Sequence, residues 1–430
     1  MSMRRGEPRA ELWPRYILWA LLALIVLVLG CSTVYRVAWD DVARTDYTVY
    51  RLAGQAAVHG GNLYAVQNER GWNYVYPPPF ALLMVLFANL SLAWGALLWY
   101  LLEVVAIALS AIMSVSLLEP VPKGRYRMAL YSLPLLYLST LLVSGIMRCQ
   151  ASEFVIALVI ATFYFHFRQR PALAGLCLAG AAAIKVFPLA LLAYFIVRRQ
   201  WRVLAATLAG TALLLLVLPA LFWGWQQNMT YLHEWIDAVG RPALMPNTER
   251  ALATPLFGQL MDTFKSRNQS LEALFLTIGA QAQDIRFLVA CTGTVMLVLM
   301  GLAARRVSSH EDELRLCSAF LVWQLLIPPI SETHYFGMMI LPLTIMLGLF
   351  MRSHQNNNAP RTAMNGLGIM MLAVMVLIGF RTTELMRPLC LASLVIWCAL
   401  LHALWQTPTA SRTAIPAIRG WSGNVQDADV

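Results

Sequence analysis

The amino-acid sequence contains several stretches of about twenty residues that carry almost no charge. The clearest run from 16 to 38, 203 to 223, 287 to 304 and 364 to 380. A helix of that length rises about 30 Å, the thickness of the hydrocarbon layer of a membrane. Only 13% of the 430 residues are charged, about half the usual share in soluble domains, so too little charge remains to cover a water-facing surface. The sequence therefore predicts an all-α, polytopic membrane protein.

The first apolar segment is expected to remain as an anchor. Residues 16–38 are too long for a removable signal peptide, and they lack a clear cleavage site of small residues.

The charged residues and the cysteines exclude several other functions. The net charge of +10 comes from lysines and arginines scattered in twos and threes between apolar runs, with no basic domain, so nucleic acid is not an expected partner. The seven cysteines lie mostly in apolar segments and include no CxxC pair. The sequence therefore indicates neither a disulfide framework nor a zinc site.

Positive charge beside apolar segments predicts the side of the membrane that each connection occupies, because basic loops stay cytoplasmic. Basic clusters precede the first apolar segment and recur near 123–127, 168–170, 198–202 and 305–315. If all are cytoplasmic, the chain crosses an even number of times between them. Residues 94–118 then return the chain to the cytoplasm, and the apolar run 77–90 does not cross. We place 77–90 as an interfacial or re-entrant helix in an extracytoplasmic first loop, residues 39–93.

The same alternation predicts a single transmembrane domain over residues 1–410, with about 11–13 spanning helices. Beyond residue 118 the expected helices are 129–144, 151–167, 171–184, 187–198, 203–223, 284–304, 313–329, 336–351, 364–380 and 388–407. A second long extracytoplasmic loop covers 224–283. Residues 411–430 are polar and rich in small side chains, which predicts a disordered cytoplasmic tail.

Two of the expected helical regions are interrupted beside an ionisable residue. The stretch 171–197 is too long for one span and too short for two, and it carries Lys185 with a proline three residues later. Two short helices meeting at Lys185 near the outer face would explain this length. The prolines at 328–329 similarly end a span just before Glu332 and His334.

The first loop carries the most suggestive acidic residue. Asp46, Tyr50 and Ala53 have the i, i+4, i+7 spacing of one helix face, with Asp46 at the N-terminal end, where a carboxylate is favoured. Asp46 either caps this helix or serves as a general base at the membrane surface. Asp40 and Asp41 are weaker candidates, since paired acids just after a span are often solvated. They permit a divalent metal, but no acidic spacing here compels one.

Three further ionisable residues lie at expected helix ends on the same side. Lys185, among apolar neighbours, either snorkels from a helix end or attracts a phosphate at headgroup depth. Arg148 leaves the same two alternatives open. His334, flanked by Glu332 and Tyr335, is either a hydrogen-bonded structural residue or part of a functional site.

An ordered series of short motifs runs from about residue 40 to residue 345. The motifs are Asp46-Tyr-Thr-Val-Tyr50 with Ala53, Gly61-Asn-Leu-Tyr64, Tyr76-Pro-Pro-Pro-Phe80, Ile184-Lys185-Val-Phe-Pro188, Arg198-Arg199-Gln-Trp201-Arg202, Asn268-Gln-Ser270-Leu and Ser331-Glu-Thr-His334-Tyr335. In this order they resemble glycosyltransferase family 87, integral-membrane enzymes of the GT-C type. Cys149-Gln150-Ala-Ser152 departs from the family's Gly-Gln-x-Asn pattern, and Thr333 stands where bulkier residues are usual.

The resemblance implies an inverting transfer of a monosaccharide, with mannose favoured, from a polyprenyl-phosphate donor to an extracytoplasmic lipid or glycan acceptor. In that reading Asp46 is the general base, and His334 orients the acceptor, contacts the phosphate or pairs with Asp46. Lys185, with Arg148 or Arg381, holds the leaving phosphate. The other expected substrate-pocket residues are Tyr50, Tyr64, Tyr76, Gln150, Asn268, Glu332 and Tyr335.

The resemblance further implies a bacterial inner membrane protein with a cytoplasmic N-terminus and an extracytoplasmic active site. Its partners are membrane lipid, the lipid-linked donor and the acceptor. The donor is a co-substrate and no tightly bound cofactor is expected, while a requirement for a divalent metal stays open.

Other protein classes fit parts of the same pattern. A transporter or flippase for lipid-linked glycans would carry charge near the bilayer midplane, and the absence of repeats or matching halves in the sequence weakens that reading. A ligase or polymerase with a lipid-diphosphate donor would also place a base and cations outside, so donor identity separates it from a transferase. A structural scaffold would need no Lys185 in an apolar turn.

Overall fold

The computed structural model describes residues 13–40, 45–122, 124–245, 256, 258, 267–355 and 386–406. Within these residues the regular structure is helical apart from two isolated β-bridges, which confirms the all-α class. The predicted span 364–380 and the predicted tail 411–430 lie outside the described residues, as do Asp41 and Arg381.

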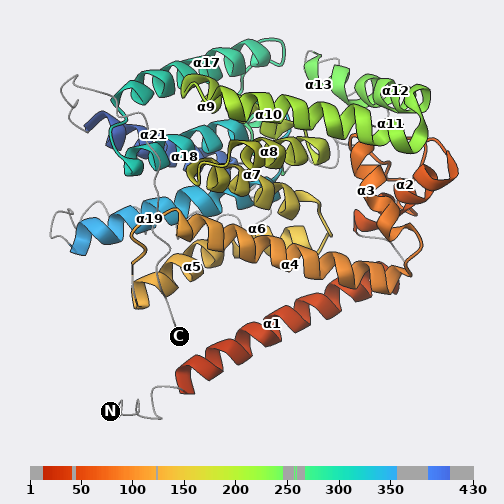
Figure 1. The fold of residues 1–430 in the computed structure, drawn as a ribbon, viewed down its shortest axis with the longest axis horizontal. Helices are drawn as coiled ribbons and strands as arrows, with labels where there is room; N and C mark the ends of the chain where they lie inside the picture. Colours follow the sequence, from red (N-terminus) through yellow and green to blue (C-terminus); the bar gives the residue numbers. More distant parts are fainter. Residues whose placement is uncertain are drawn as a thin grey trace.

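Two long helices form one side of the molecule. Helix α1 (Trp13–Ala38) packs along α4 (Leu92–Ser116), with α1 the outlying helix at the bottom of Figure 1. The Tyr100 hydroxyl donates a hydrogen bond to the carbonyl of Val26, and the ring of Tyr100 leaves no room for a side chain at Gly30. Both helices exceed the ~20 residues needed to cross a bilayer.

Two shorter helices of the predicted first loop lie together at one end of the molecule. Helices α2 (Tyr47–His59) and α3 (Pro78–Ala88) pack against each other at the right of Figure 1. Prolines suit the start of α3 because their missing N–H would be unpaired there in any case. With eleven residues α3 is about 17 Å long, which is too short to cross a bilayer and agrees with the prediction for 77–90.

The middle of the chain forms a layer of short helices. They are α5 (Arg125–Tyr137), α6 (Ser139–Ile146), α7 (Ser152–Phe167), α8 (Pro171–Ile184), η2 (Phe187–Leu191) and α9 (Leu192–Val197). The expected single helix 129–144 is wrong: α5 and α6 are bent by 63° around Leu138, and Pro134 lies in the last turn of α5. The predicted break at Lys185 is confirmed, since α8 ends at Ile184 and η2 begins at Phe187.

The remaining described helices pack around this layer. They are α10 (Trp201–Ala212), η3 (Leu213–Val217), α11 (Leu218–Trp223), α12 (Trp225–Trp235), η4 (Ile236–Gly240), α13 (Arg241–Leu244), α16 (Leu271–Thr277), α17 (Ile285–Ala303), η5 (Ala304–Arg306), α18 (His310–Leu326), η6 (Thr333–Met339), α19 (Ile340–Gln355) and α21 (Pro388–Gln406). Helices α11 and α12 contact α3, so the second predicted outer loop meets the first.

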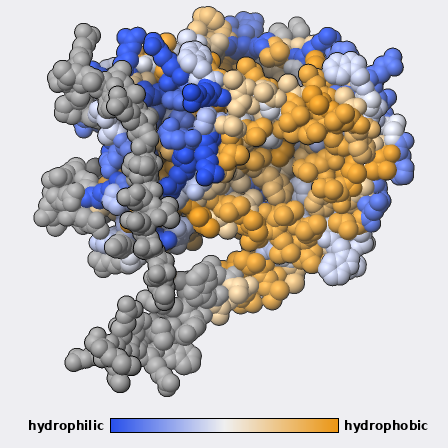
Figure 2. All heavy atoms as spheres, viewed as in Figure 1, coloured by the Kyte–Doolittle hydropathy of each residue, from blue (hydrophilic) through white to orange (hydrophobic). Residues whose placement is uncertain are grey.

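The surface carries the signature of a membrane protein. Figure 2 shows a broad hydrophobic area on one face, with hydrophilic side chains to its left and along its right edge. Five described helices are long and apolar enough to span a membrane, or six if the bent α5–α6 pair forms one span. Shorter apolar helices, among them α7 and α8, coincide with several of the other predicted spans but fall below this length. The protein is therefore a multi-pass membrane protein, and the higher count stays a prediction.

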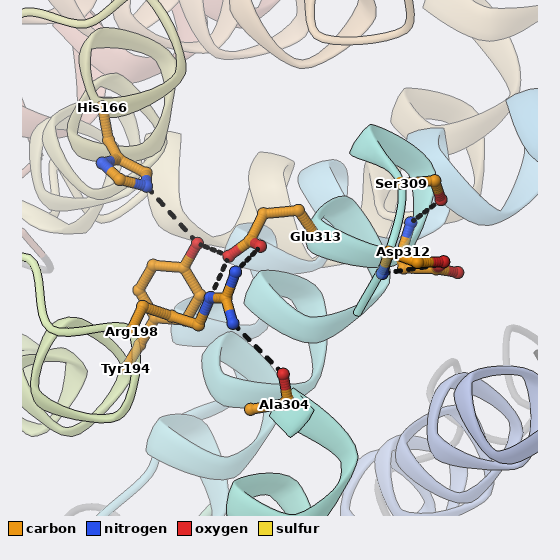
Figure 3. A network of polar contacts seen from close by, with 8 residues as sticks. His166, Tyr194, Arg198, Ala304, Ser309, Asp312 and Glu313 are labelled. Carbon is orange, nitrogen blue, oxygen red and sulfur yellow. Dashed lines mark hydrogen bonds and ion pairs between the residues drawn. The ribbon is translucent and has the colours of Figure 1, made fainter. Parts of the chain in front are cut away.

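A polar network joins the helix ends opposite Lys185 (Figure 3). The guanidinium of Arg198 binds both carboxylate oxygens of Glu313, at 2.9 and 2.6 Å, and the carbonyl of Ala304 at 3.1 Å. The Tyr194 hydroxyl donates to Glu313 at 2.6 Å and lies 3.5 Å from Nε2 of His166. The network ties α7, α9, η5 and α18 together, and this fixes the layer that positions the other end of α7 and α8.

Candidate active site

Four connections that are distant in the sequence meet at one end of the helix layer, which we call the site end. They are the residue before α2, the turn between α6 and α7, the break after α8 and the turn before η6. Each brings an ionisable side chain: Asp46, Arg148, Lys185 and Glu332. These charges interact with one another, because Lys185 and Arg148 both act electrostatically on Asp46 and on Glu332.

Asp46 is the N-cap residue of α2, but its side chain makes no capping hydrogen bond. Its backbone N–H donates to the carbonyl of Arg148 at 2.9 Å. Its carboxylate instead accepts a hydrogen bond from the amide of Gln150, and the Tyr50 hydroxyl lies 3.5 Å away. Burial raises the pKa of Asp46 to about 6, while Lys185 and Arg148 oppose that rise. The geometry favours the general-base interpretation of Asp46 over a purely capping one.

An aromatic wall lies beside Asp46. The hydroxyls of Tyr50 and Tyr76 are 2.7 Å apart, and their rings pack edge to face. Phe80 and Trp99 pack against the ring of Tyr50. All four rings are buried, so they form an apolar surface next to the carboxylate.

Lys185 is 9% exposed and lies at the break between α8 and η2. Its ammonium group donates to the Ser152 hydroxyl at 2.9 Å and to the Tyr335 hydroxyl at 3.2 Å. Burial lowers the pKa of Lys185 to about 8, and the negative charges of Glu332 and Asp46 oppose that fall. Lys185 is therefore a buried cation held at the site end, rather than a residue that extends into solvent.

The turn before η6 supplies a carboxylate, and the first turn of η6 supplies an imidazole. Oε2 of Glu332 lies 3.2 Å from Nδ1 of His334, and the Tyr335 hydroxyl lies 3.5 Å from Oε1 of Glu332. Burial raises the pKa of Glu332 to about 7, against the effect of Lys185 and Arg148. Nε2 of His334 is buried and has no hydrogen-bond partner among the described residues. A buried polar atom of that kind is available to a ligand.

Asn268 holds this turn in place instead of facing the site. Its amide donates to the carbonyl of Pro329 at 2.7 Å, and its carbonyl oxygen accepts from the backbone N–H of Ser331 at 2.9 Å. The guanidinium of Arg387 donates to the backbone carbonyl of Asn268 at 2.9 Å. The side chain of Asn268 thus positions the residues around Glu332.

The structure gathers most of the predicted site residues. Those at the site end are Asp46, Tyr50, Tyr76, Arg148, Gln150, Lys185, Glu332, His334 and Tyr335. Tyr64 and Asn268 do not contact these charged groups directly: Tyr64 binds the backbone of Tyr76, and Asn268 binds the backbone of Pro329. Arg381 is outside the described residues. No pairing of His334 with Asp46 is present among the described contacts.

Three polar residues at or near this end were not among the predicted site residues. Ser152 accepts the hydrogen bond of Lys185, and its neighbour Glu153 is fully buried with both oxygens unpaired among the described residues. Glu103 of α4 is also fully buried and accepts from the indole of Trp99 at 2.9 Å. The two glutamates could have been identified from the sequence, because a carboxylate inside an apolar helix is itself an indication of function.

The chemical capability of the site follows from these contacts. A carboxylate that titrates near neutrality can take a proton, and a buried ammonium beside it can stabilise a developing negative charge. Among the described residues, no group of three histidine, cysteine, aspartate or glutamate side chains is placed to hold a metal ion.

Comparison with known proteins agrees with this capability. Residues 74–329, more than half of the chain, match the model of glycosyltransferase family 87. The chain is 26% identical over 369 residues to a polyprenol-phosphate-mannose-dependent alpha-(1-2)-phosphatidylinositol mannoside mannosyltransferase of Mycobacterium tuberculosis, covering 81% of this chain and 80% of the relative. It is 25% identical over 382 residues to the protein of the same description from Mycolicibacterium smegmatis, covering 82% and 81%.

Proposed function

The chain belongs to glycosyltransferase family 87, and from that premise we propose that it transfers mannose from a polyprenyl phosphate to a hydroxyl group of a lipid or glycan acceptor. The descriptions of the two mycobacterial relatives support this donor. The site end would face the extracytoplasmic side of a bacterial inner membrane, where such an acceptor is exposed.

One observation carries the proposal. The carboxylate of Asp46 and the ammonium of Lys185 come from segments 139 residues apart (185 − 46), yet they share one buried site and influence each other's protonation. A sugar transfer from a phosphate needs both a base for the acceptor and a cation for the leaving group. The site supplies the two together.

The proposed reaction is a single displacement. Asp46 takes the proton of the acceptor hydroxyl while that oxygen bonds to the anomeric carbon. The bond from the anomeric carbon to the phosphate oxygen breaks, and its electron pair leaves with the polyprenyl phosphate. Lys185 stabilises the charge that grows on that phosphate, with Arg148 beside it. Attack opposite the leaving group inverts the anomeric configuration.

The family match favours a transferase over a transporter. Asp46, Lys185 and Glu332 lie at helix ends, whereas Glu103 and Glu153 are buried inside α4 and α7. A lipid-diphosphate ligase is chemically closer, because it needs the same base and cations. Only the donor separates the two enzymes.

The experiment that tests the proposal compares donors. The purified full chain in lipid nanodiscs is incubated with polyprenyl-phosphate mannose or polyprenyl-diphosphate mannose, with a phosphatidylinositol mannoside as acceptor. We expect product only with the monophosphate donor. Transfer from the diphosphate alone would favour the ligase, and an inactive wild-type protein with either donor would reject the proposed reaction.

A further inference from the structure

An open pocket of about 430 Å³ lies beside the aromatic wall. It is lined by the turn that follows α2 and by the end of α12 with the start of η4. Its lining residues are Asn62, Tyr64, Ala65, Glu234, Asp237, Ala238 and Leu256. Small-molecule sites commonly enclose about 300–1,000 Å³, so this volume suits a short saccharide.

The two walls of the pocket are fixed to each other. The Tyr231 hydroxyl of α12 donates to the carbonyl of Gly61 at 2.7 Å. The indole of Trp235 donates to the carbonyl of Val75 at 3.1 Å. A ligand would therefore meet a largely preformed surface, which reduces the entropy lost on binding.

Most polar groups of the pocket are hydrogen-bond acceptors. The side-chain oxygen of Asn62 accepts from the backbone N–H groups of Tyr64 and Ala65, at 2.8 and 3.1 Å, so its NH2 group faces Glu234. That NH2 group lies 3.4 Å from Oε1 of Glu234. Oε2 of Glu234 is buried and has no hydrogen-bond partner among the described residues. It is an unsatisfied acceptor in the wall of the pocket.

The charge of the pocket restricts the ligand. Asp237 adds a second carboxylate, which pairs with Arg241 at 2.9 Å. None of the described lining residues carries a positive charge. Two carboxylates repel a phosphate or a sugar acid, whereas they accept hydrogen bonds from sugar hydroxyls. The preferred ligand is an uncharged sugar.

The pocket is connected to Asp46 through a short series of tyrosines. The Tyr64 hydroxyl donates to the backbone carbonyl of Tyr76 at 3.1 Å, and the Tyr64 ring packs on Tyr74 with centroids 5.8 Å apart. Tyr76 in turn contacts Tyr50 beside Asp46. A saccharide in the pocket therefore lies one aromatic layer from the proposed base.

We propose that this pocket binds the uncharged glycan part of the acceptor, beyond the sugar whose hydroxyl is glycosylated. This inference rests on the transferase function proposed above and assigns to the acceptor a subsite of its own. The phosphate groups of donor and acceptor lie elsewhere, toward Lys185 and Arg148.

Sugar binding tests the pocket without requiring transfer. Saturation-transfer NMR of the full chain in nanodiscs uses methyl α-dimannoside as probe and methyl glucuronide as the acidic comparison. We expect a dimannoside signal with the wild type that falls at least fivefold in Glu234→Gln, which removes the open carboxylate, and in Ala65→Trp, which fills the pocket. Asp284→Asn removes an acidic side chain outside the pocket and should keep the signal.

The outcomes separate this inference from the proposed function. Equal dimannoside signals in the wild type and both pocket variants, or an equally strong glucuronide signal, would overturn the subsite. No dimannoside signal with the wild type would overturn it too. If the signal depends on the pocket but no mannose is transferred, the subsite stands and the proposed reaction fails. Size-exclusion profiles and circular dichroism of each variant establish that the folds are equal.

Discussion

The ammonium group of Lys185 lies 3.2 Å from the hydroxyl of Tyr335, a residue 150 positions further along the chain, and 4.2 Å from the centroid of its ring. The Ser152 hydroxyl binds the same ammonium at 2.9 Å. These two contacts fix the orientation of the ammonium group. In the proposed reaction Lys185 is therefore oriented before the phosphate arrives, which is the condition for a cation to stabilise a transition state effectively.

Replacing Asp46 should abolish transfer without affecting the fold. In Asp46→Asn the side chain keeps its shape and its place next to Gln150, but it cannot take a proton. We therefore expect kcat to fall about 10²- to 10⁴-fold. The measurement is the initial rate at saturating donor and acceptor, with size-exclusion behaviour as the check on folding. Asp40→Asn, a change in the same predicted loop, should retain activity. A wild-type rate for Asp46→Asn would reject the base assignment.

Lys185 should act mainly on the donor. Lys185→Met removes the charge and keeps an apolar stem, so the KM for polyprenyl-phosphate mannose should rise and kcat should fall, each by about tenfold or more. The KM for the acceptor should change little. Lys185→Arg should recover part of the donor affinity. An unchanged donor dependence in Lys185→Met would remove this lysine from the phosphate site.

The pH dependence of kcat/KM should be bell-shaped. The pKa of Asp46 is raised to about 6, so the base is ionised, and the enzyme active, only above that pH. The pKa of Lys185 is lowered to about 8, so its charge and its effect on the phosphate are lost above that pH. Arginine stays charged throughout this range. Lys185→Arg should therefore abolish the alkaline limb of the profile and leave the acid limb near pH 6. If Lys185→Arg keeps the wild-type alkaline limb, that limb does not report the titration of Lys185.

The network in Figure 3 should contribute to stability and not to chemistry. Glu313→Gln leaves the Arg198 guanidinium without its anionic partner, and we expect a loss of about 2–3 kcal/mol, seen as a lower melting temperature. Arg241→Ala breaks an ion pair whose side chains are 69% and 58% exposed, so it should change stability by about 0.5 kcal/mol or less. At a temperature where Glu313→Gln is folded, its transfer rate should match the wild type. If Glu313→Gln melts at the same temperature as the wild type, the network does not stabilise the fold.

The helices were predictable from the sequence because their causes are local. The apolar runs that became α8 and α17 are bounded by charged residues or proline. The break at Lys185 followed from a stretch that is too long for one span and too short for two. The bend around Leu138 was not predictable, because a proline near the end of a helix is compatible with either a straight or a bent path.

The site was predictable only as a set of residues, since its contacts depend on packing between distant segments. The pairing of Lys185 with Ser152 joins positions 33 apart, and nothing in either local sequence encodes that distance. The role of Asn268 was likewise hidden. Its motif placed it near the site, but only the structure shows that its amide is occupied by the backbone around Pro329.

The last test concerns Asn268, whose side chain affects the site only by holding the turn that carries Glu332. Asn268→Ala leaves the carbonyl of Pro329 and the N–H of Ser331 without these partners, which should cost about 1–3 kcal/mol of stability. Because Glu332 and His334 then lose their fixed position, kcat should fall by about tenfold or more while the donor KM changes little. Asn268→Asp keeps the acceptor for Ser331 but turns a carboxylate oxygen toward the Pro329 carbonyl, so it should lower the melting temperature and kcat at least as much as Asn268→Ala. If instead the acceptor KM alone rises, Asn268 contacts the substrate directly and does not act by positioning the turn.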